Sequence, residues 1–282
     1  MNQDKYYVKI TSKHNLFDLK LKEVWQYRQL VLLLTKRDFT IRYKQTILGP
    51  AWLFIRPLFT AVIYSIVFGN IANIGTEGIP KFVFYLAGYA LWDFFSGCTY
   101  NNSQTFNYNV HLFSKVYFPR MVTSCATILT SALDFLIQMT VVLVFIVAYT
   151  LRGDIVPNFI MWGLLPFLIL WLGIMGMGVG IIVSSLTTKY RDLSILFGFI
   201  MSLWMYGTPI VYPVSFLEPG ILKNLILFNP VTSVVELFRF ILLGSGSIES
   251  VYLLWSAFFT VMVALIGILT FNRVEKTFLD TI

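Results

Sequence analysis

Residues 82–107 carry an unusual concentration of aromatic, hydroxyl and amide side chains. Tyr85, Tyr89 and Trp92 follow one another at spacings that place them on one face of an α-helix. The polar groups in the same segment are Ser96, Thr99, Tyr100, Asn101, Asn102 and Gln104. Aromatic rings can stack on an apolar surface, and hydroxyls and amides exchange hydrogen bonds. The pattern suits contact with a ligand that has both apolar and polar sides. The alternative is an aromatic face that packs inside the protein or lies at a membrane interface.

Three ionisable residues, Arg56, Asp93 and Asp134, interrupt long apolar stretches. A charge inside hydrocarbon is costly, so such residues normally face a partner or water. At a rise of ~1.5 Å per residue, Arg56 and Asp93 lie at similar depths in their helices, which permits an ion pair between them. The alternative is that Arg56 extends to the lipid headgroups. A proton relay is disfavoured because no chain of further acids or histidines continues from the two aspartates.

The stretches that must position these residues are long and apolar. At 57% hydrophobic and 12% charged residues, the chain is far less charged than a soluble domain, in which about 25% of residues are charged. A helix of ~20 apolar residues crosses ~30 Å of hydrocarbon, and each stretch approaches that length. We therefore predict an all-α polytopic membrane protein with six transmembrane helices. The predicted spans are residues 50–70, 82–100, 121–149, 160–186, 193–212 and 251–271.

Lysine and arginine are distributed unevenly around these predicted spans. Sixteen lie before the first span, between spans two and three, between spans four and five, or after span six; only four lie in the other loops. Because positive residues stay on the cytoplasmic side, both termini are expected to be cytoplasmic in a plasma membrane protein. Anionic lipid headgroups explain the net charge of +7 better than nucleic acid does, so no nucleic-acid partner is expected.

Two segments outside the predicted spans have structures of their own. Residues 20–44 interleave apolar and basic side chains, which predicts an amphipathic helix in the cytoplasmic interface. The alternative is a short cytoplasmic helix packed on the bundle. Residues 213–250 are apolar but broken by prolines, which favours short re-entrant or interfacial helices between spans five and six. Pro57, inside the first span, should kink or break its helix. Gly176 and Gly180 form a G-x-x-x-G pair, which permits close helix approach.

The sequence lacks the residue patterns that several functions require. The sequence has no G-x-x-x-x-G-K-[ST] nucleotide-binding motif, so any ATP must be bound by another polypeptide. His14 and His111 lie far apart without nearby cysteines, so no metal site is expected, and no cofactor is expected on this chain. Cys98 and Cys125 are expected to be packing residues. The polar N-terminal residues predict no cleavable signal peptide.

Four segments, in order along the chain, resemble the ABC-2-type permeases of polysaccharide exporters for O-antigen, capsule or teichoic acid. They are RYKQTILGPAWLFIRPL (42–58), YRDLSILFGFIMSLWMYGTPIVYP (190–213), NPVTSVVELFRFILLG (229–244) and FNRVEKTFLDTI (271–282). The resemblance implies one ABC-2-type transmembrane domain over residues 1–282. Residues 1–48 would form its cytoplasmic N-terminus, 49–271 the six-span bundle and 272–282 its tail.

The resemblance further implies a half-transporter in the cell inner membrane that is not itself an enzyme. Two copies of the chain would form a channel, and two copies of a separate ABC ATPase, carrying ATP and Mg, would drive export of a polyprenyl-linked glycan. O-antigen is the substrate that we favour. The aromatic and polar residues from Tyr85 to Gln104 would then contact sugar. An ABC-2 exporter of drugs, lipids or teichoic acid is one alternative, and an integral-membrane glycosyltransferase is less favoured because acids in its loops are few and scattered.

Residues 107–120 form a short basic and aromatic segment between the second and third predicted spans. The resemblance implies that this segment is a coupling helix seated on the ATPase. An ordinary positively charged loop is the alternative. The expected coupling residues are His111, Leu112, Phe113, Lys115, Tyr117 and Arg120.

Overall fold

The computed structural model describes residues 21–116, 118–187, 190 and 192–277. Every regular element in these ranges is helical, as predicted. The α-helices are α1 (Leu21–Gln26), α2 (Arg28–Tyr43), α3 (Trp52–Tyr64), α4 (Lys81–Ser103), α5 (Thr105–Tyr108), α6 (Val110–Lys115), α7 (Met121–Leu151), α8 (Leu165–Thr187), α9 (Asp192–Tyr206), α10 (Ile221–Phe228), α11 (Pro230–Leu243) and α12 (Ser250–Thr277). The short elements are the 3₁₀ turns η1 (Gly49–Ala51), η3 (Phe159–Leu164) and η4 (Val214–Phe216), and the π-helix η2 (Ser65–Ile71).

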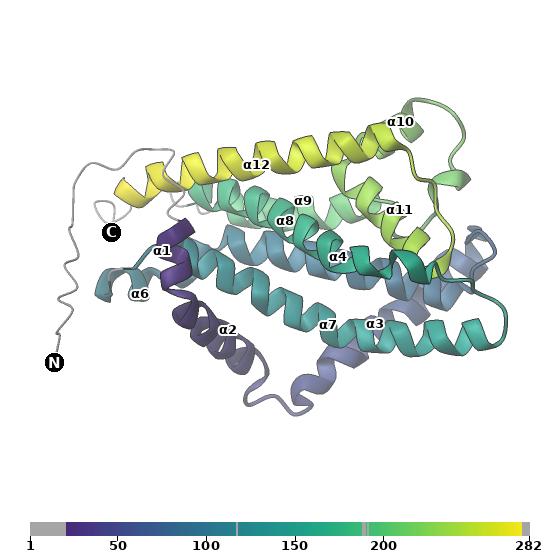
Figure 1. Cartoon of the computed structure of the whole chain (residues 1–282), viewed down its shortest axis with the longest axis horizontal. Coiled ribbons are helices and arrows are strands. Elements are labelled where there is room, and N and C mark those ends of the chain that lie inside the picture. The colour runs from purple at the N-terminus through teal and green to yellow at the C-terminus, as the bar shows by residue number, and fades with distance from the viewer. Residues whose placement is uncertain (1–20, 117, 188–189, 191, 278–282) are drawn as a thin grey trace.

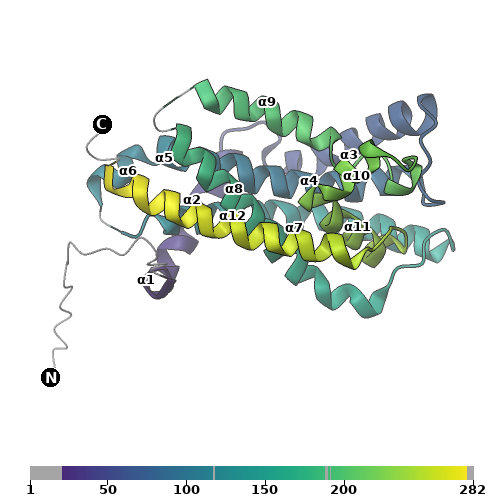
Figure 2. The ribbon, with the colours of Figure 1, turned by 90° about the horizontal axis from the view of Figure 1, so that it is seen from above.

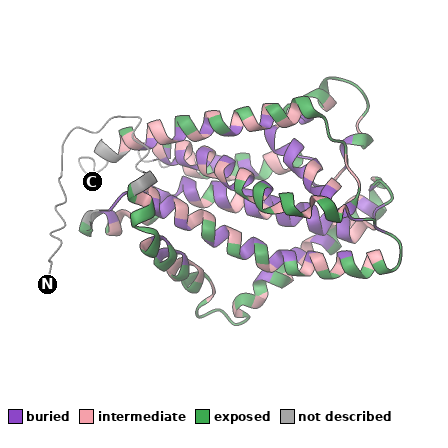
Figure 3. Ribbon diagram, viewed as in Figure 1, coloured by how far each residue is buried: buried purple, intermediate pink, exposed green. Residues whose placement is uncertain are grey.

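The long helices α4, α7, α8 and α12 run side by side along the molecule (Figures 1 and 2). Helix α4 is central, because it packs against α3, α7, α8, α9 and α11. Sixteen of its 23 residues are buried, as Figure 3 illustrates. Large aromatic rings contribute much of this burial and stabilise the centre of the bundle. The segment with the most polar and aromatic chemistry is therefore also the core of the protein.

Four helices are long and apolar enough to cross a membrane, or five if one bent pair of helices counts as a span. This count, which covers the described residues, differs from the six predicted spans. Helix α4 is long enough, but Asp93 and the polar residues near its end make it less apolar than the others. Helix α9 has only 15 residues, because Gly207 and Pro209 follow Tyr206 and oppose further helix. The four candidate spans are Gly49–Ile71, Met121–Leu151, Phe159–Thr187 and Ser250–Val274.

The expected break at Pro57 does not occur. Helix α3 continues from Trp52 to Tyr64 through this proline, and the wider π-helix η2 extends it. Proline lacks an N–H and so removes one hydrogen bond of a helix, a loss that neighbouring groups can compensate in membrane proteins. The entry to the first span is therefore one continuous helix, and a kink at Pro57 stays a prediction.

The N-terminal helix α2 packs along α7. Val31 and Leu34 are buried in this contact, and the Thr35 hydroxyl donates to the carbonyl of Ala126 over 3.4 Å. The opposite side of α2 leaves Leu32 exposed. Residues 20–44 thus form two helices, α1 and α2, that dock on the bundle as in the alternative reading, while an apolar side stays open. The interfacial position in a bilayer remains a prediction.

The segment before α12 forms the bent pair α10 and α11, which meet at 82°. The side chain of Asn229 caps α11 by accepting from the backbone N–H of Val231 over 3.2 Å, and Pro230 occupies the first turn. Gly244 ends the helix at φ 73°, and a Cβ there would lie 2.3 Å from the carbonyl oxygen of Val156. Helix α11 is almost entirely buried, so it enters the bundle instead of lying on its surface. This arrangement fits the predicted short helices between spans five and six.

The glycines of the G-x-x-x-G pair, Gly176 and Gly180 on α8, pack against α4 of the same chain. A Cβ on Gly180 would lie 2.4 Å from the carbonyl oxygen of Thr99, and a Cβ on Gly176 would lie 2.9 Å from the Thr99 hydroxyl. Only hydrogen at these positions allows α8 to approach α4 so closely. This contact fixes how α4 is rotated, and therefore which of its side chains face outward.

Candidate functional site: a polar groove along α4

A polar groove runs along one side of α4, beside α2 and α7 at one end and between α3 and α9 at the other, and we name it the α4 groove. Three cavities of about 600, 400 and 370 Å³ form it. The first and second cavities share Arg42 and Asn101, and the second and third share Arg56, Asp93 and Ser96, so the three adjoin. The groove begins beside α5 and ends beside the last turn of α9.

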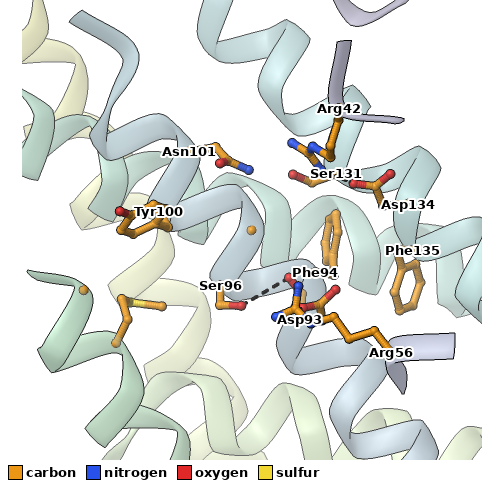
Figure 4. A pocket seen from close by; sticks show the side chains of 13 residues that line it. Arg42, Arg56, Asp93, Phe94, Ser96, Tyr100, Asn101, Ser131, Asp134 and Phe135 are labelled. Atoms are coloured by element: carbon orange, nitrogen blue, oxygen red, sulfur yellow. Dashed lines mark hydrogen bonds and ion pairs between the residues drawn. The ribbon is translucent and has the colours of Figure 1, made fainter. Parts of the chain in front are cut away.

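Five of the nine predicted ligand-contacting residues line this groove. Tyr89 and Trp92 line the third cavity, and Ser96 lines both the second and the third. Tyr100 and Asn101 line the second, as Figure 4 shows. The groove therefore offers aromatic rings near one end and hydroxyl and amide groups along its length.

The other four predicted residues, Tyr85, Thr99, Asn102 and Gln104, are buried away from the groove. The Tyr85 ring is 0% exposed and packs edge-on to Tyr64, with centroids 6.2 Å apart. Thr99 and Asn102 donate to backbone carbonyls one turn earlier, over 2.7 and 2.8 Å. Gln104 is hydrogen-bonded to α9. These side chains help to pack the helices, and their contact with a ligand stays a prediction.

The structure brings Arg56 and Asp93 together across the groove. The Arg56 Nη2 atom lies 3.6 Å from the Asp93 Oδ1 atom. Gln138 on α7 donates a hydrogen bond to the other carboxylate oxygen over 2.8 Å. The Arg56 side chain remains 68% exposed and lines the groove, so its guanidinium has hydrogen-bonding capacity left for a ligand.

Asp134 is paired with a residue that the sequence did not suggest. Its carboxylate forms an ion pair with Arg42, which lies at the end of α2. The Tyr43 hydroxyl donates to the same carboxylate over 3.1 Å. Burial, reinforced by the charge of Asp134, raises the pKa of Tyr43 to about 12, so the phenol stays protonated. No sequence signal links these residues, because they are about 90 positions apart and belong to different elements.

Arginine–carboxylate pairs recur along the α4 groove. Arg37 and Asp38 form a third pair at the entrance beside α5, with 2.7 Å between nitrogen and oxygen. Each of the three arginines has its own carboxylate, so the three pairs have no net charge. The groove can therefore exchange hydrogen bonds and stacking contacts with a mainly neutral ligand while still offering cationic groups locally.

The predicted coupling segment folds as α5 and α6. Phe113 and Arg120 are buried, and the Arg120 guanidinium lies 5.2 Å from the centre of the Phe113 ring. His111 and Lys115 are exposed, and Leu112 is half-buried. Tyr117 lies outside the described residues. Phe113 and Arg120 thus contribute to shaping the segment, while His111 and Lys115 are presented outward.

A further charged pair lies inside the bundle, where the sequence indicated an outer loop. Arg239 on α11 is 0% exposed, and its guanidinium lies 3.1 Å from the Glu236 carboxylate. The guanidinium also donates to the carbonyl of Ile210 over 2.9 Å and lies 4.0 Å from the centre of the Phe84 ring. The second Glu236 oxygen accepts from the backbone N–H of Ser247 over 3.0 Å. This pair ties α11 to α4 and to the loop after α9.

In the part of the chain that the structure describes, no three His, Cys, Asp or Glu side chains gather as metal ligands. The fold and the groove define a class: an all-helical, multi-pass membrane protein with a polar groove, lined in part by aromatic residues, beside its central helix.

The family follows from comparison with known proteins. The model of the ABC-2 type transporter family matches residues 29–243, and the chain belongs to this family. It is therefore the membrane permease component of a transporter and not a catalytic one. ABC-2 permeases generally work with ABC ATPase subunits.

Curated relatives agree with this assignment. An O-antigen export system permease protein RfbA of Klebsiella pneumoniae is 28% identical over 252 residues, covering 89% of this chain and 94% of that protein. A second K. pneumoniae protein of the same name is 27% identical, with the same coverage of both chains. The RfbA protein of Myxococcus xanthus is 26% identical over 84% of this chain and 93% of its own length.

Proposed function

We propose that this chain is the permease of an ABC exporter that moves a lipid-linked polysaccharide, of the O-antigen type, from the cytoplasmic to the outer face of the inner membrane. The observation that carries the proposal is similarity over nearly the full length to permeases named for O-antigen export. The α4 groove supports it, because sugars combine apolar C–H faces with hydroxyl edges and the groove offers partners for both.

In the proposed transporter, two copies of the chain form the channel and two ABC ATPase subunits bind ATP and Mg. The chain crosses the membrane six times, with α4 and α9 added to the four candidate spans Gly49–Ile71, Met121–Leu151, Phe159–Thr187 and Ser250–Val274. Both termini are cytoplasmic. The start of α1, helix α6 and the end of α12 lie at one end of the molecule (Figure 1), which would place the ATPase there.

Within the α4 groove, Tyr89, Trp92, Ser96, Tyr100 and Asn101 contact the moving glycan. A chain that slides must not be held tightly at any point. Many weak stacking and hydrogen-bonding contacts meet this need better than a few strong ones.

The test is deletion of the gene, with complementation by the wild-type chain, followed by analysis of surface glycan and of lipid-linked glycan inside the cell. Loss of surface polymer with accumulation of lipid-linked polymer inside is the expected result. The polymer that disappears identifies the substrate, O-antigen or teichoic acid. Loss of synthesis with no intermediate, or unchanged surface polymer, would contradict the proposal.

A further inference from the structure

Two arginines, Arg42 and Arg56, line the second cavity of the α4 groove, and each lies beside a carboxylate. Figure 4 shows Arg42 beside Asp134 and Arg56 beside Asp93, as separate pairs around the cavity. Arg56, Asp93 and Asp134 belong to predicted spans, where charged groups normally face a partner or water. The cavity of about 400 Å³ equals the volume of roughly a dozen liquid waters, which is ample for a diphosphate group.

Both carboxylates have a second donor that does not depend on the arginines. Asp93 accepts from the Gln138 amide over 2.8 Å, and Asp134 accepts from the Tyr43 hydroxyl over 3.1 Å. If an arginine turns away, its carboxylate keeps a hydrogen-bond donor and is not stranded. Glu236 also has a second donor, so the groove pairs differ from that buried pair in exposure: the Arg42 and Arg56 side chains are 38% and 68% exposed, whereas that of Arg239 is 1% exposed.

The arginines have donors to spare. A guanidinium has several N–H groups, and the Arg56 contact with Asp93 at 3.6 Å is longer than a hydrogen bond. A phosphate group accepts paired hydrogen bonds from arginine, and a diphosphate carries a negative charge on each phosphate. An anion in the cavity can therefore compete with the carboxylates for Arg42 and Arg56. The nearby Asp93 and Asp134 also keep its affinity moderate, because they repel it and take the arginines back when it leaves.

We propose that Arg42 and Arg56 form a binding site for the diphosphate group of a lipid-linked sugar, with Asp134 and Asp93 holding the arginines in place between transport events. The proposal rests on the function proposed above and adds the place where the carrier group is recognised. The amide of Asn101, which lines the same cavity, supplies a further hydrogen-bond donor to the anion.

The test uses the full chain in complex with its ATPase and measures binding of undecaprenyl diphosphate by native mass spectrometry. Arg56→Gln is expected to weaken binding about tenfold, a typical effect of losing one hydrogen bond between charged groups. Asp93→Asn keeps the shape and the acceptor for Gln138 but frees Arg56, so it should tighten binding a few-fold. If the ion pair is only structural, both substitutions should change binding in the same direction and to the same extent, and that result would overturn the proposal.

Three controls sharpen the test. Arg152→Gln removes an exposed arginine outside the groove and should leave binding unchanged. Undecaprenol has the lipid without phosphate, and its binding should be equal in all variants; a loss in Arg56→Gln would overturn the site. Inorganic diphosphate should compete only weakly with undecaprenyl diphosphate. If inorganic diphosphate binds as tightly as the lipid does, the site binds free anions and the assignment to a lipid carrier is overturned. The melting temperature of each variant shows that it is folded.

Surface glycan measured in cells that carry the same variants separates this proposal from the proposed function. Normal glycan export by wild type together with unchanged binding in Arg56→Gln would overturn the site and leave the function standing. Surface glycan that does not depend on the wild-type chain would instead overturn the function.

Discussion

At the scale of single residues, identical side chains on α4 have different environments. Tyr85 and Tyr89 are one helical turn apart, and the ring of Tyr64 contacts both. Only Tyr89 lines the α4 groove. The Tyr85 hydroxyl has no hydrogen-bond partner among the described residues. The two tyrosines should therefore respond differently to substitution.

Tyr85→Ala is expected to lower the amount of protein in the membrane, because truncating a fully buried aromatic residue costs ~3–5 kcal/mol. Tyr85→Phe keeps the ring and should preserve both abundance and export. Tyr89 and Trp92 line the groove but are only 6% and 5% exposed, so the double substitution Tyr89→Ala with Trp92→Ala should lower export by more than it lowers abundance. Immunoblots of membranes and assays of surface glycan on the same cells measure both effects. Normal export by the double variant at normal abundance would contradict a role of these rings in the channel.

The buried pair of Arg239 and Glu236 gives a second prediction for single residues. Arg239→Met leaves Glu236 without its counter-charge, and breaking a buried pair in this way typically costs about 3–5 kcal/mol. Adding Glu236→Gln removes the stranded charge and keeps an acceptor for the N–H of Ser247. The double variant should therefore be more stable than Arg239→Met alone. Thermal unfolding of the purified chain compares them, and equal losses would show that the charge is not the cause.

At the scale of elements, the packing of α8 on α4 decides which face of α4 meets the groove. Gly180→Ala places a methyl group where the carbonyl oxygen of Thr99 lies 2.4 Å away, so the helices must separate or rotate. Such overpacking costs typically ~1–3 kcal/mol. Gly163→Ala is the matched control, because a Cβ there has no neighbour within 4 Å. Melting temperatures should fall for Gly180→Ala only, and an equal effect of both would contradict this account.

Helix α6 provides a prediction about the ATPase. His111 and Lys115 face outward, so replacing both with alanine should weaken association with the ATPase at unchanged abundance. Phe113→Ala empties a buried position in the cluster with Phe106 and Phe118, so it should lower abundance as well. Pull-down of the ATPase with the tagged permease measures association. Unchanged association in the His111 and Lys115 double variant would place the ATPase contact elsewhere.

At the scale of the whole molecule, the two ends should lie on opposite sides of the membrane. The loops after α7 and before α10 lie at the end opposite to α6 (Figure 1). In a background lacking Cys98 and Cys125, cysteines at the exposed positions Asp154 and Glu218 should react with an impermeant reagent in intact cells. Cysteine at Lys115 should react only after the cells are opened. Labelling of Lys115 from outside would invert the topology.

The sequence alone determined the class of protein, because the length and apolarity of a spanning helix are properties of about 20 neighbouring residues. It also identified the Arg56–Asp93 pair as one of two arrangements for these charges, since depth along a helix can be counted from its end, and the structure decided between the pair and an Arg56 that extends to the headgroups. The number of spans was harder to predict from the sequence. Polar residues make α4 less apolar, and α9 ends early, so neither helix has the length and hydropathy from which spans are counted.

Only the tertiary structure decided which side chains face the groove and which partners the charges have. Tyr85 and Tyr89 look equivalent in a helical pattern, yet the packing of α3 and η2 encloses one and leaves the other beside a cavity. Arg42 and Asp134 are 92 residues apart, and no local pattern joins them. Arg239 occupies a segment that looks like a loop, but α11 carries it into the core. Exposure and pairing depend on how distant helices pack, whereas helix length and hydropathy are local. For this reason the sequence indicated the class and its chemical groups, and the fold selected which of them form a site.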